Sequence, residues 1–210
     1  MPYPMSDPVS PLRTETLRGA ALRPWLPALS RLRVAVFRDW PYLYEGDPRW
    51  EEDYLAAYAD RPDAAAVLAF AGEEGGREVV GAATCQPMAE THDAVRETFS
   101  RAGLDPAAFC YFGESVLLAP WRGQGIGLRF FEGREAHARA LGLRHAAFVG
   151  VRRDPADPRR PAGHVPLDGF WARRGYRHHP EIVVRMDWPE IGSDGGEVAH
   201  ELTAWLKDLT

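Results

Sequence analysis

A glycine-rich turn between a strand-like run and a helical pattern constrains the fold of this chain most strongly. Residues 109–118 are largely apolar, the run Arg122-Gly-Gln-Gly-Ile-Gly127 follows, and a helical pattern begins at Gln124. Glycines at a helix start leave backbone N–H groups unpaired, with no Cβ to keep a ligand away, and the helix dipole adds partial positive charge. The sequence therefore predicts a strand, turn and helix that hold a phosphate or pyrophosphate.

Three glycine-rich phosphate motifs compete for this turn. A P-loop requires lysine and a hydroxyl residue after its last glycine, but none follows Gly127, and the single lysine of the chain is Lys207. A dinucleotide fingerprint requires glycine where Leu128 stands and an acidic residue about 20 positions later, in a region that is apolar here. The pattern Arg/Gln-x-x-Gly-x-Gly/Ala matches residues 122–127 at every defined position.

With this third pattern, the chain resembles the GCN5-related N-acetyltransferases, in which the motif holds the pyrophosphate of acetyl-coenzyme A. The run Leu167-Asp-Gly-Phe-Trp-Ala-Arg-Arg-Gly-Tyr176 looks like the second signature of that family, Phe-Tyr-x-x-x-Gly-Phe. The two signatures occur in the family's order, and the resemblance covers roughly residues 105–187. It implies transfer of an acetyl group from acetyl-CoA to a primary amine of a small molecule or peptide, by direct transfer.

Hydrophobic periodicity predicts a mixed α/β fold. Strands early in the chain, followed by a strand–helix–strand unit, favour a mixed sheet with helices on both faces. The resemblance implies that this sheet is mostly antiparallel, with two splayed parallel strands at the cofactor site. We expect strands at 13–18, 64–71, 78–87, 109–118, 145–151 and 182–188, and helices at 24–37, 50–59, 92–102, 124–141, 166–174 and 197–209.

Composition limits the class of protein. A chain of 210 residues with 45% hydrophobic content is predicted to form one domain, residues 1–210, that buries a real core. A net charge of −5 argues against a nucleic-acid partner. The sequence contains no run of 18 apolar residues and no signal-peptide pattern, which predicts a cytoplasmic protein without membrane contact. Homodimers are common in the family, so a homodimer is one possible state.

The resemblance also assigns cofactor contacts. Backbone groups of the strand before the turn would pair with the pantetheine arm and polarise the thioester carbonyl, and the turn would hold the diphosphate. The positions implied for the strand are Leu117, Leu118 and Ala119, and those for the turn are Arg122, Gly123, Gln124, Gly125, Ile126 and Gly127.

Glu114 is the first candidate for the catalytic base. It is a carboxylate within an otherwise apolar strand, three residues before the expected thioester contact, and it could accept the proton that the acceptor amine must lose. The alternative is an outward-facing side chain or one that binds a neighbouring arginine. Strand alternation places Glu114 and Leu117 on opposite faces, so a bulge would be needed to direct both toward the site.

The second signature departs from the family at Trp171, where many relatives have a tyrosine that protonates the leaving thiolate. Indole cannot act as an acid at neutral pH, although its N–H can donate a hydrogen bond to sulfur. Trp171 is therefore either a cofactor contact or a core residue. His164 occupies a place where relatives often have a cofactor-binding asparagine. It could contact the pantetheine, supply the missing acid, or be a loop residue.

Acceptor choice is expected in the first half of the chain. The segment 40–47 is aromatic, acidic and rigidified by proline, and Tyr42, Tyr44 and Glu45 could line a pocket for an amine. An ordinary packed loop is the competing interpretation. A non-catalytic acyl-CoA-binding protein is the alternative function, supported by the departure at Trp171.

Overall fold

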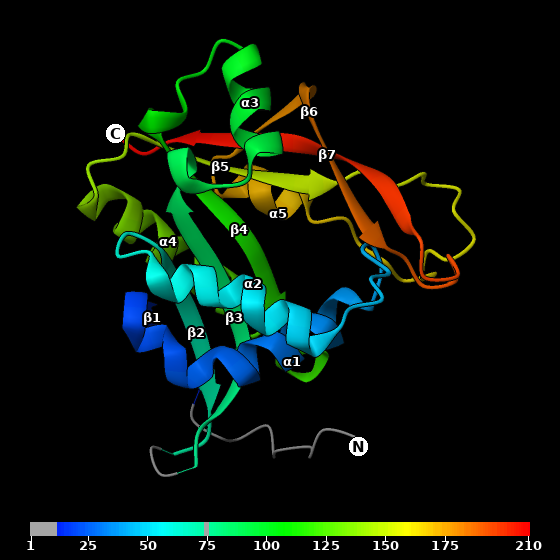
Figure 1. The fold of residues 1–210 in the computed structure, drawn as a ribbon, viewed down its shortest axis with the longest axis horizontal. Helices are drawn as coiled ribbons and strands as arrows, with labels where there is room; N and C mark the ends of the chain where they lie inside the picture. Colours follow the sequence, from blue (N-terminus) through cyan, green and yellow to red (C-terminus); the bar gives the residue numbers. More distant parts are fainter. Residues whose placement is uncertain (1–11, 74–75) are drawn as a thin grey trace.

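The computed structural model describes residues 12–73 and 76–210. Within them, a seven-stranded sheet has the order β1-β2-β3-β4-β5-β7-β6 (Figure 1). All neighbouring strands are antiparallel except β4 and β5, which are parallel. The strands are β1 (Leu12–Arg18), β2 (Ala65–Ala71), β3 (Glu78–Pro87), β4 (Phe109–Leu117), β5 (His145–Val151), β6 (Arg177–Pro189) and β7 (Glu197–Asp208).

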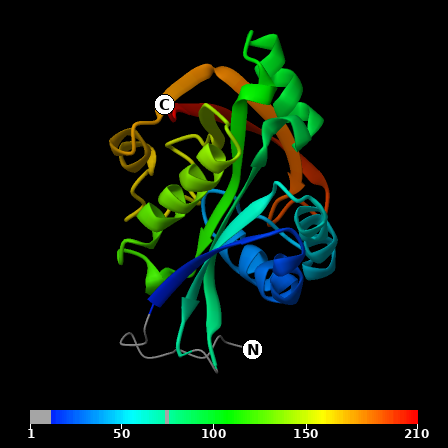
Figure 2. The ribbon, with the colours of Figure 1, turned by 90° about the vertical axis from the view of Figure 1, so that its left-hand side faces the viewer.

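Helices cover both faces of the sheet, as predicted. In Figure 2, α1, α2 and α3 lie on one side of the strands, and α4 and α5 lie on the other. None of the described helices is long and apolar enough to cross a membrane. The α-helices are α1 (Leu26–Phe37), α2 (Pro48–Asp60), α3 (Asp93–Arg101), α4 (Ile126–Ala140) and α5 (Asp168–Arg173), and the 3₁₀ turns are η1 (Gly19–Trp25), η2 (Met88–Glu90), η3 (Pro106–Ala108) and η4 (Ala119–Trp121).

The central strands are apolar on both faces because both faces are covered. In β4, Phe109 and Tyr111 pack with the apolar side chains of α3, whereas Cys110 and Phe112 pack with those of α4. This alternation explains why β2, β3, β4 and β5 appear in the sequence as nearly continuous apolar runs. Apolar side chains are thus buried on both faces of the sheet, in four clusters of the described residues.

The predicted C-terminal helix at 197–209 is wrong, because Glu197–Asp208 forms β7. The apolar residues Leu202, Trp205 and Leu206 have helical spacing, but residues 202–206 are all buried. The strand lies between β5 and β6 and pairs with both, which gives it a partner along each edge. Long-range pairing of this kind overrides local helix propensity.

Candidate active site

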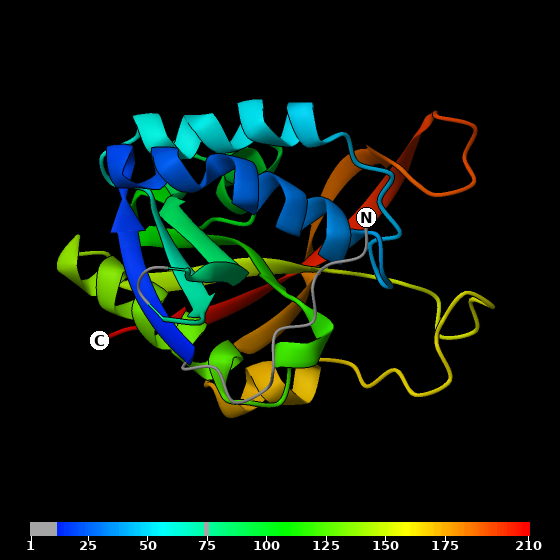
Figure 3. The ribbon, with the colours of Figure 1, turned by 90° about the horizontal axis from the view of Figure 1, so that it is seen from below.

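The turn between β4 and α4 has the geometry that the glycine pattern predicts. Gly123 and Gly125 have φ values of +77° and +79°, a region that other residues rarely adopt, and Gly125 is the N-cap of α4. A Cβ built at either glycine would meet no atom within 4 Å among the described residues. Figure 3 shows this turn and α5 below the sheet, on the side away from α1 and α2. The turn is therefore open to a ligand.

Backbone N–H groups of the turn are also available to bind a ligand. Within residues 12–73 and 76–210, the N–H groups of residues 123–127 donate to no backbone carbonyl outside regular structure. The N–H of Arg122, in contrast, donates to the carbonyl of Ala119 at 3.1 Å. Arg122 also donates from Nε to the Leu117 carbonyl at 3.1 Å, so its side chain braces the turn from within. Donors for a diphosphate are thus available from Gly123 onward.

The parallel strands β4 and β5 separate soon after they meet. They pair over three positions, from Phe109 with His145 to Tyr111 with Ala147. Beyond this point, β4 pairs only with β3 and β5 only with β7, and Figure 1 shows the two strands diverging. The facing edges of residues 113–117 and 149–151 therefore have backbone groups that do not pair with each other, as the family resemblance implies.

The residues between β4 and the turn are partly engaged already. Leu118 donates its N–H to the Val80 carbonyl at 3.0 Å, and the carbonyls of Leu117 and Ala119 both accept from Arg122. The N–H of Ala119 donates to no backbone carbonyl of the described chain. Of the three predicted positions, Ala119 therefore retains a donor for a ligand.

A bulge in β4 determines where Glu114 points. Ala83 pairs with Ser115 and Cys85 pairs with Phe112, so Gly113 and Glu114 together lie opposite Thr84. The Glu114 N–H donates to Thr84 Oγ1 at 3.2 Å. A Cβ at Gly113 would lie 2.6 Å from the same oxygen, so glycine is needed here. The Glu114 side chain contacts α1, whereas Leu117 packs with the core under α4, so the two side chains lie on opposite faces.

Arg33 on α1 is the main partner of Glu114, which agrees with the alternative that Glu114 binds an arginine, although no local pattern indicated which arginine. Its Nη1 lies 2.7 Å from Glu114 Oε1, and its Nε donates to Glu51 Oε2 on α2. Burial alone would lower the pKa of Arg33, but the two carboxylates outweigh it and the pKa is raised. The guanidinium also lies over the Tyr54 ring, 4.7 Å from its centroid.

Four tyrosines surround this ion pair, of which Tyr58 and Tyr111 are buried and Tyr42 and Tyr54 are half-buried. Burial first, and the Glu114 charge second, raise the pKa of Tyr42 and of Tyr54 to about 12. Burial also raises the pKa values of Tyr58 and Tyr111, with a further contribution from Glu114. All four phenols are therefore neutral at pH 7. We call this group the Arg33 cluster: Arg33, Tyr42, Glu51, Tyr54, Tyr58, Tyr111 and Glu114.

Of the predicted acceptor residues, Tyr42 belongs to this cluster and Tyr44 and Glu45 follow it in the chain; both tyrosines are half-buried and Glu45 is exposed. The Tyr42 ring packs between Phe37 and Trp188. The backbone of Tyr44 forms an isolated antiparallel β-bridge with that of Glu190. The pKa of Tyr44 is raised by burial and then by Glu51, which places its hydroxyl near the cluster. Glu45 is exposed, and only its backbone is engaged, with the Pro189 carbonyl.

Three loops meet next to the cluster. Arg153, after β5, donates to the carbonyls of Pro41 and Tyr42 at 2.6 and 2.9 Å and lies 2.5 Å from Glu190. Arg159 donates to the other oxygen of Glu190 at 3.0 Å. Burial opposes the effect, but the two arginines lower the pKa of Glu190. Arg153 thus ties the loop after β5 to the segment after α1, and the Glu190 carboxylate holds both arginines.

His164 and Trp171 have their ring contacts with residues other than Glu114. The His164 ring lies against Trp40, with centroids 6.1 Å apart, and burial followed by the Arg160 charge lowers its pKa. Trp171 packs its ring against Phe148 and Trp205, at 5.0 and 5.2 Å between centroids. Trp171 is half-buried, and its ring lies 3.1 Å from the position of a Cβ at Gly150, on the β5 edge that separates from β4, so it stays a candidate cofactor contact.

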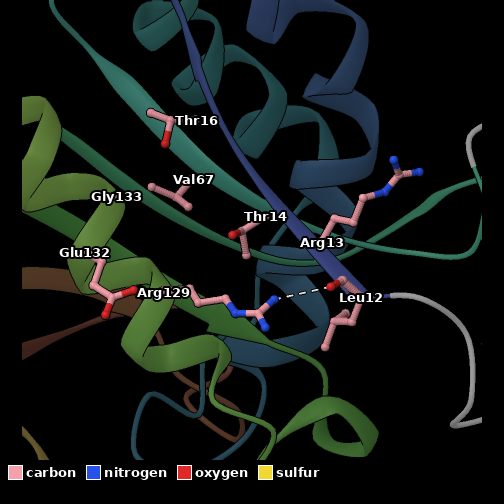
Figure 4. A pocket seen from close by; sticks show the side chains of 8 residues that line it. All are labelled: Leu12, Arg13, Thr14, Thr16, Val67, Arg129, Glu132 and Gly133. Atoms are coloured by element: carbon pink, nitrogen blue, oxygen red, sulfur yellow. Dashed lines mark hydrogen bonds between the residues drawn. The ribbon is translucent and has the colours of Figure 1, made fainter.

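A separate pocket of about 630 Å³ lies between β1 and α4. Figure 4 shows Thr14 and Thr16 on one wall and Arg129 and Glu132 on the other, with Arg129 Nη1 donating to the Leu12 carbonyl at 3.3 Å. None of the predicted site residues lines it. The candidate active site is therefore the region that joins the turn, the separating strands and the Arg33 cluster.

Comparison with known proteins identifies the fold. No family model and no curated protein matches the sequence. Three similar solved structures are a GCN5-related N-acetyltransferase from Kribbella flavida (16% identity, TM-score 0.54, 94% of this chain and 97% of that chain), yncA from Salmonella typhimurium with its cofactor acetyl-CoA (13%, 0.55, 94% and 95%) and Arabidopsis thaliana NAA60 in complex with a bisubstrate analogue (11%, 0.57, 94% and 100%). The chain therefore has the fold of the GCN5-related N-acetyltransferases.

Proposed function

We propose that this protein is an acetyl-CoA-dependent N-acetyltransferase that transfers the acetyl group directly to a primary amine of a small molecule or peptide. The observation that supports this most is the open glycine turn at the end of a strand that separates from its parallel neighbour. Two proteins of the same fold add support, one solved with acetyl-CoA and one with a bisubstrate analogue. A cytoplasmic location and a homodimer stay predictions from the sequence.

The residues present fit acetyl-CoA. The N-terminus of α4 and the free N–H groups of residues 123–127 would hold the diphosphate, because backbone donors and the helix dipole both favour an anion there. The unpaired edges of residues 113–117 and 149–151, together with the Ala119 N–H, would bind the amides of the pantetheine arm. Acetyl-CoA would supply the acetyl thioester.

Glu114 is the proposed base. The acceptor enters as an ammonium ion and must lose a proton before its nitrogen can form the C–N bond, while the C–S bond to the thiol breaks. Glu114 lies on the strand edge that would bind the pantetheine arm, and 7% of its side chain is exposed. Because the indole of Trp171 cannot act as an acid at neutral pH and the lowered pKa of His164 leaves it neutral at pH 7, we assign the proton of the departing thiolate to solvent.

The proposed acceptor contacts are Tyr42, Tyr44 and Glu45. Tyr42 within the Arg33 cluster and Tyr44 next to it are half-buried aromatic residues, and Glu45 offers an exposed carboxylate at the edge of the same segment. A cationic acceptor with an apolar body would find both kinds of contact there.

Thiol release from acetyl-CoA in the presence of a panel of amines tests the proposal. We expect Glu114→Gln to lower kcat by about 10²–10⁴-fold, the usual contribution of a general base, while acetyl-CoA affinity stays unchanged. Glu97→Gln is the control, because Glu97 is an exposed residue of α3. Tight acetyl-CoA binding without turnover of any amine would instead favour the non-catalytic acyl-CoA-binding function.

A further inference from the structure

The charge balance of the Arg33 cluster bears on the kind of amine that the site accepts. One guanidinium, that of Arg33, faces two carboxylates, those of Glu51 and Glu114. The tyrosines of the cluster are neutral at pH 7 because their pKa values are raised. The side chains of the cluster itself therefore have one net negative charge. A further buried guanidinium, that of Arg134 on α4, donates to the Glu114 carbonyl at 3.4 Å from the other face of the sheet.

This negative charge lies at a site of low solvent exposure, where an unpaired charge is energetically unfavourable. The Glu51 side chain is fully buried, Glu114 is 7% exposed, and Arg33 is 10% exposed. An uncompensated carboxylate at low exposure favours a cation beside it, because the surrounding medium screens charge weakly. An acceptor ammonium group would provide that cation.

The neighbouring arginines already have partners, so they do not favour a second, negatively charged group on the acceptor. Arg33 already contacts both carboxylates of the cluster. Arg153 contacts Glu190 and two backbone carbonyls, and Arg159 contacts Asp157 and Glu190. A carboxylate next to the acceptor amine would therefore meet the excess negative charge of the cluster and find these three guanidinium groups occupied.

We infer that the acceptor is a cationic amine without a carboxylate next to the amine, and that the Arg33 cluster discriminates against free amino acids. The inference rests on the proposed acetyltransferase function and names the substrate class for the same site. Alkyl amines, aryl-alkyl amines and polyamines belong to this class. Zwitterionic amino acids do not.

Matched pairs of acceptors test the inference on the wild-type protein. Thiol release is measured with tyramine against tyrosine, histamine against histidine, and cadaverine against lysine. We expect kcat/KM to be about tenfold or more higher for each amine, the effect of one like charge near a poorly screened carboxylate. Tyrosinamide retains the bulk of tyrosine without its negative charge, and we expect it to follow tyramine. Equal or faster turnover of the amino acids would overturn the inference and leave the acetyltransferase function intact.

A variant pair connects the selectivity to the cluster. Glu51→Gln removes the excess negative charge but keeps the shape, and it should reduce the tyramine-to-tyrosine ratio by about tenfold. Glu97→Gln removes an exposed carboxylate of α3 and should leave the ratio unchanged. An unchanged ratio in folded Glu51→Gln would contradict the inference, and if this variant fails to fold the wild-type comparison still decides.

Failure of the proposed function gives a different result. If no amine is acetylated, the acetyltransferase function is wrong, and calorimetric binding of the same acceptor pairs then tests the cluster alone. Binding of tyramine with weaker binding of tyrosine would support the inference. Tighter binding of tyrosine, or binding of neither member of any pair, would overturn it.

Discussion

The glycine turn and the Arg33 cluster would both serve the proposed reaction, but they differ in exposure and in the groups that they use. Residues 122–125 of the turn are exposed, and its donors come from the backbone. The cluster is buried, is built from side chains, and joins α1, α2 and β4. An anion can be held by one local segment because consecutive N–H groups converge at a helix end. A buried carboxylate needs partners from elsewhere in the chain, because an isolated charge there would be too costly.

The largest effect is expected from a substitution that removes the cation of the Arg33 cluster. Arg33→Met would leave Glu51 and Glu114 buried without their cation, so we expect the free energy of unfolding to fall by about 3–5 kcal/mol. Arg23→Met removes an exposed ion pair with Asp60 and should cost about 1 kcal/mol or less. Urea denaturation at pH 7 measures both. Similar losses of unfolding free energy for the two variants would mean that the buried ion pairs of Arg33 stabilise the fold no more than an exposed ion pair does.

The next largest effect is expected from a substitution in the glycine turn. Gly125→Val places a branched side chain at φ +79° and in the space that the diphosphate would occupy, so acetyl-CoA affinity should fall by about 100-fold or more. Gly103→Val is a matched control, because Gly103 has φ +77° and equal open space at the end of α3. Calorimetry should show normal acetyl-CoA affinity for folded Gly103→Val. An equal loss of affinity in the control would show that backbone strain, not the site, is responsible.

A smaller effect concerns the loop junction beside the cluster. The lowered pKa of Glu190 means that its ion pairs stabilise the fold above the ordinary carboxyl pKa, near 4.3, and that this stability is lost as the pH falls through the lowered value. Wild type should therefore be more stable than Glu190→Gln at pH 7, and the difference should shrink between about pH 5 and pH 3. Thermal unfolding across this range measures it. A difference that does not change with pH would contradict the assignment.

The smallest effect is expected at His164. Its ring lies against Trp40, and its lowered pKa leaves it neutral at pH 7, so His164→Ala should change kcat by less than about threefold. The pH–rate profile between pH 6 and 8 should keep its shape. A lost limb in this profile would restore His164 as an acid in the reaction.

The two regions also differ in how far the sequence could predict them. The turn, β5 and most element positions follow from local patterns, because glycine spacing and apolar periodicity reflect local backbone geometry. Glu114 stands out as a charge in an apolar strand, and binding to an arginine was one alternative for it. The identity of Arg33 as partner depends on how α1 packs over β4, which no local pattern encodes.

The C-terminal strand shows the same limit. Residues 197–208 have apolar side chains at helical spacing, yet pairing with β5 and β6 makes them a strand. Trp171 likewise has its packing determined by Phe148 and Trp205, from two different strands. Where long-range partners determine the outcome, intrinsic propensity is a weak guide.

Affinity for two acetyl thioesters tests the central claim most directly. Acetyl-CoA and S-acetylpantetheine share the thioester and pantetheine arm, but only acetyl-CoA has the diphosphate with its 3′-phosphoadenosine. If residues 123–127 hold the diphosphate, calorimetry should show one acetyl-CoA site and about 100-fold weaker binding of S-acetylpantetheine, because the charge-assisted hydrogen bonds at the helix N-terminus are lost. Equal affinity for the two thioesters, or no binding of acetyl-CoA, would contradict the account.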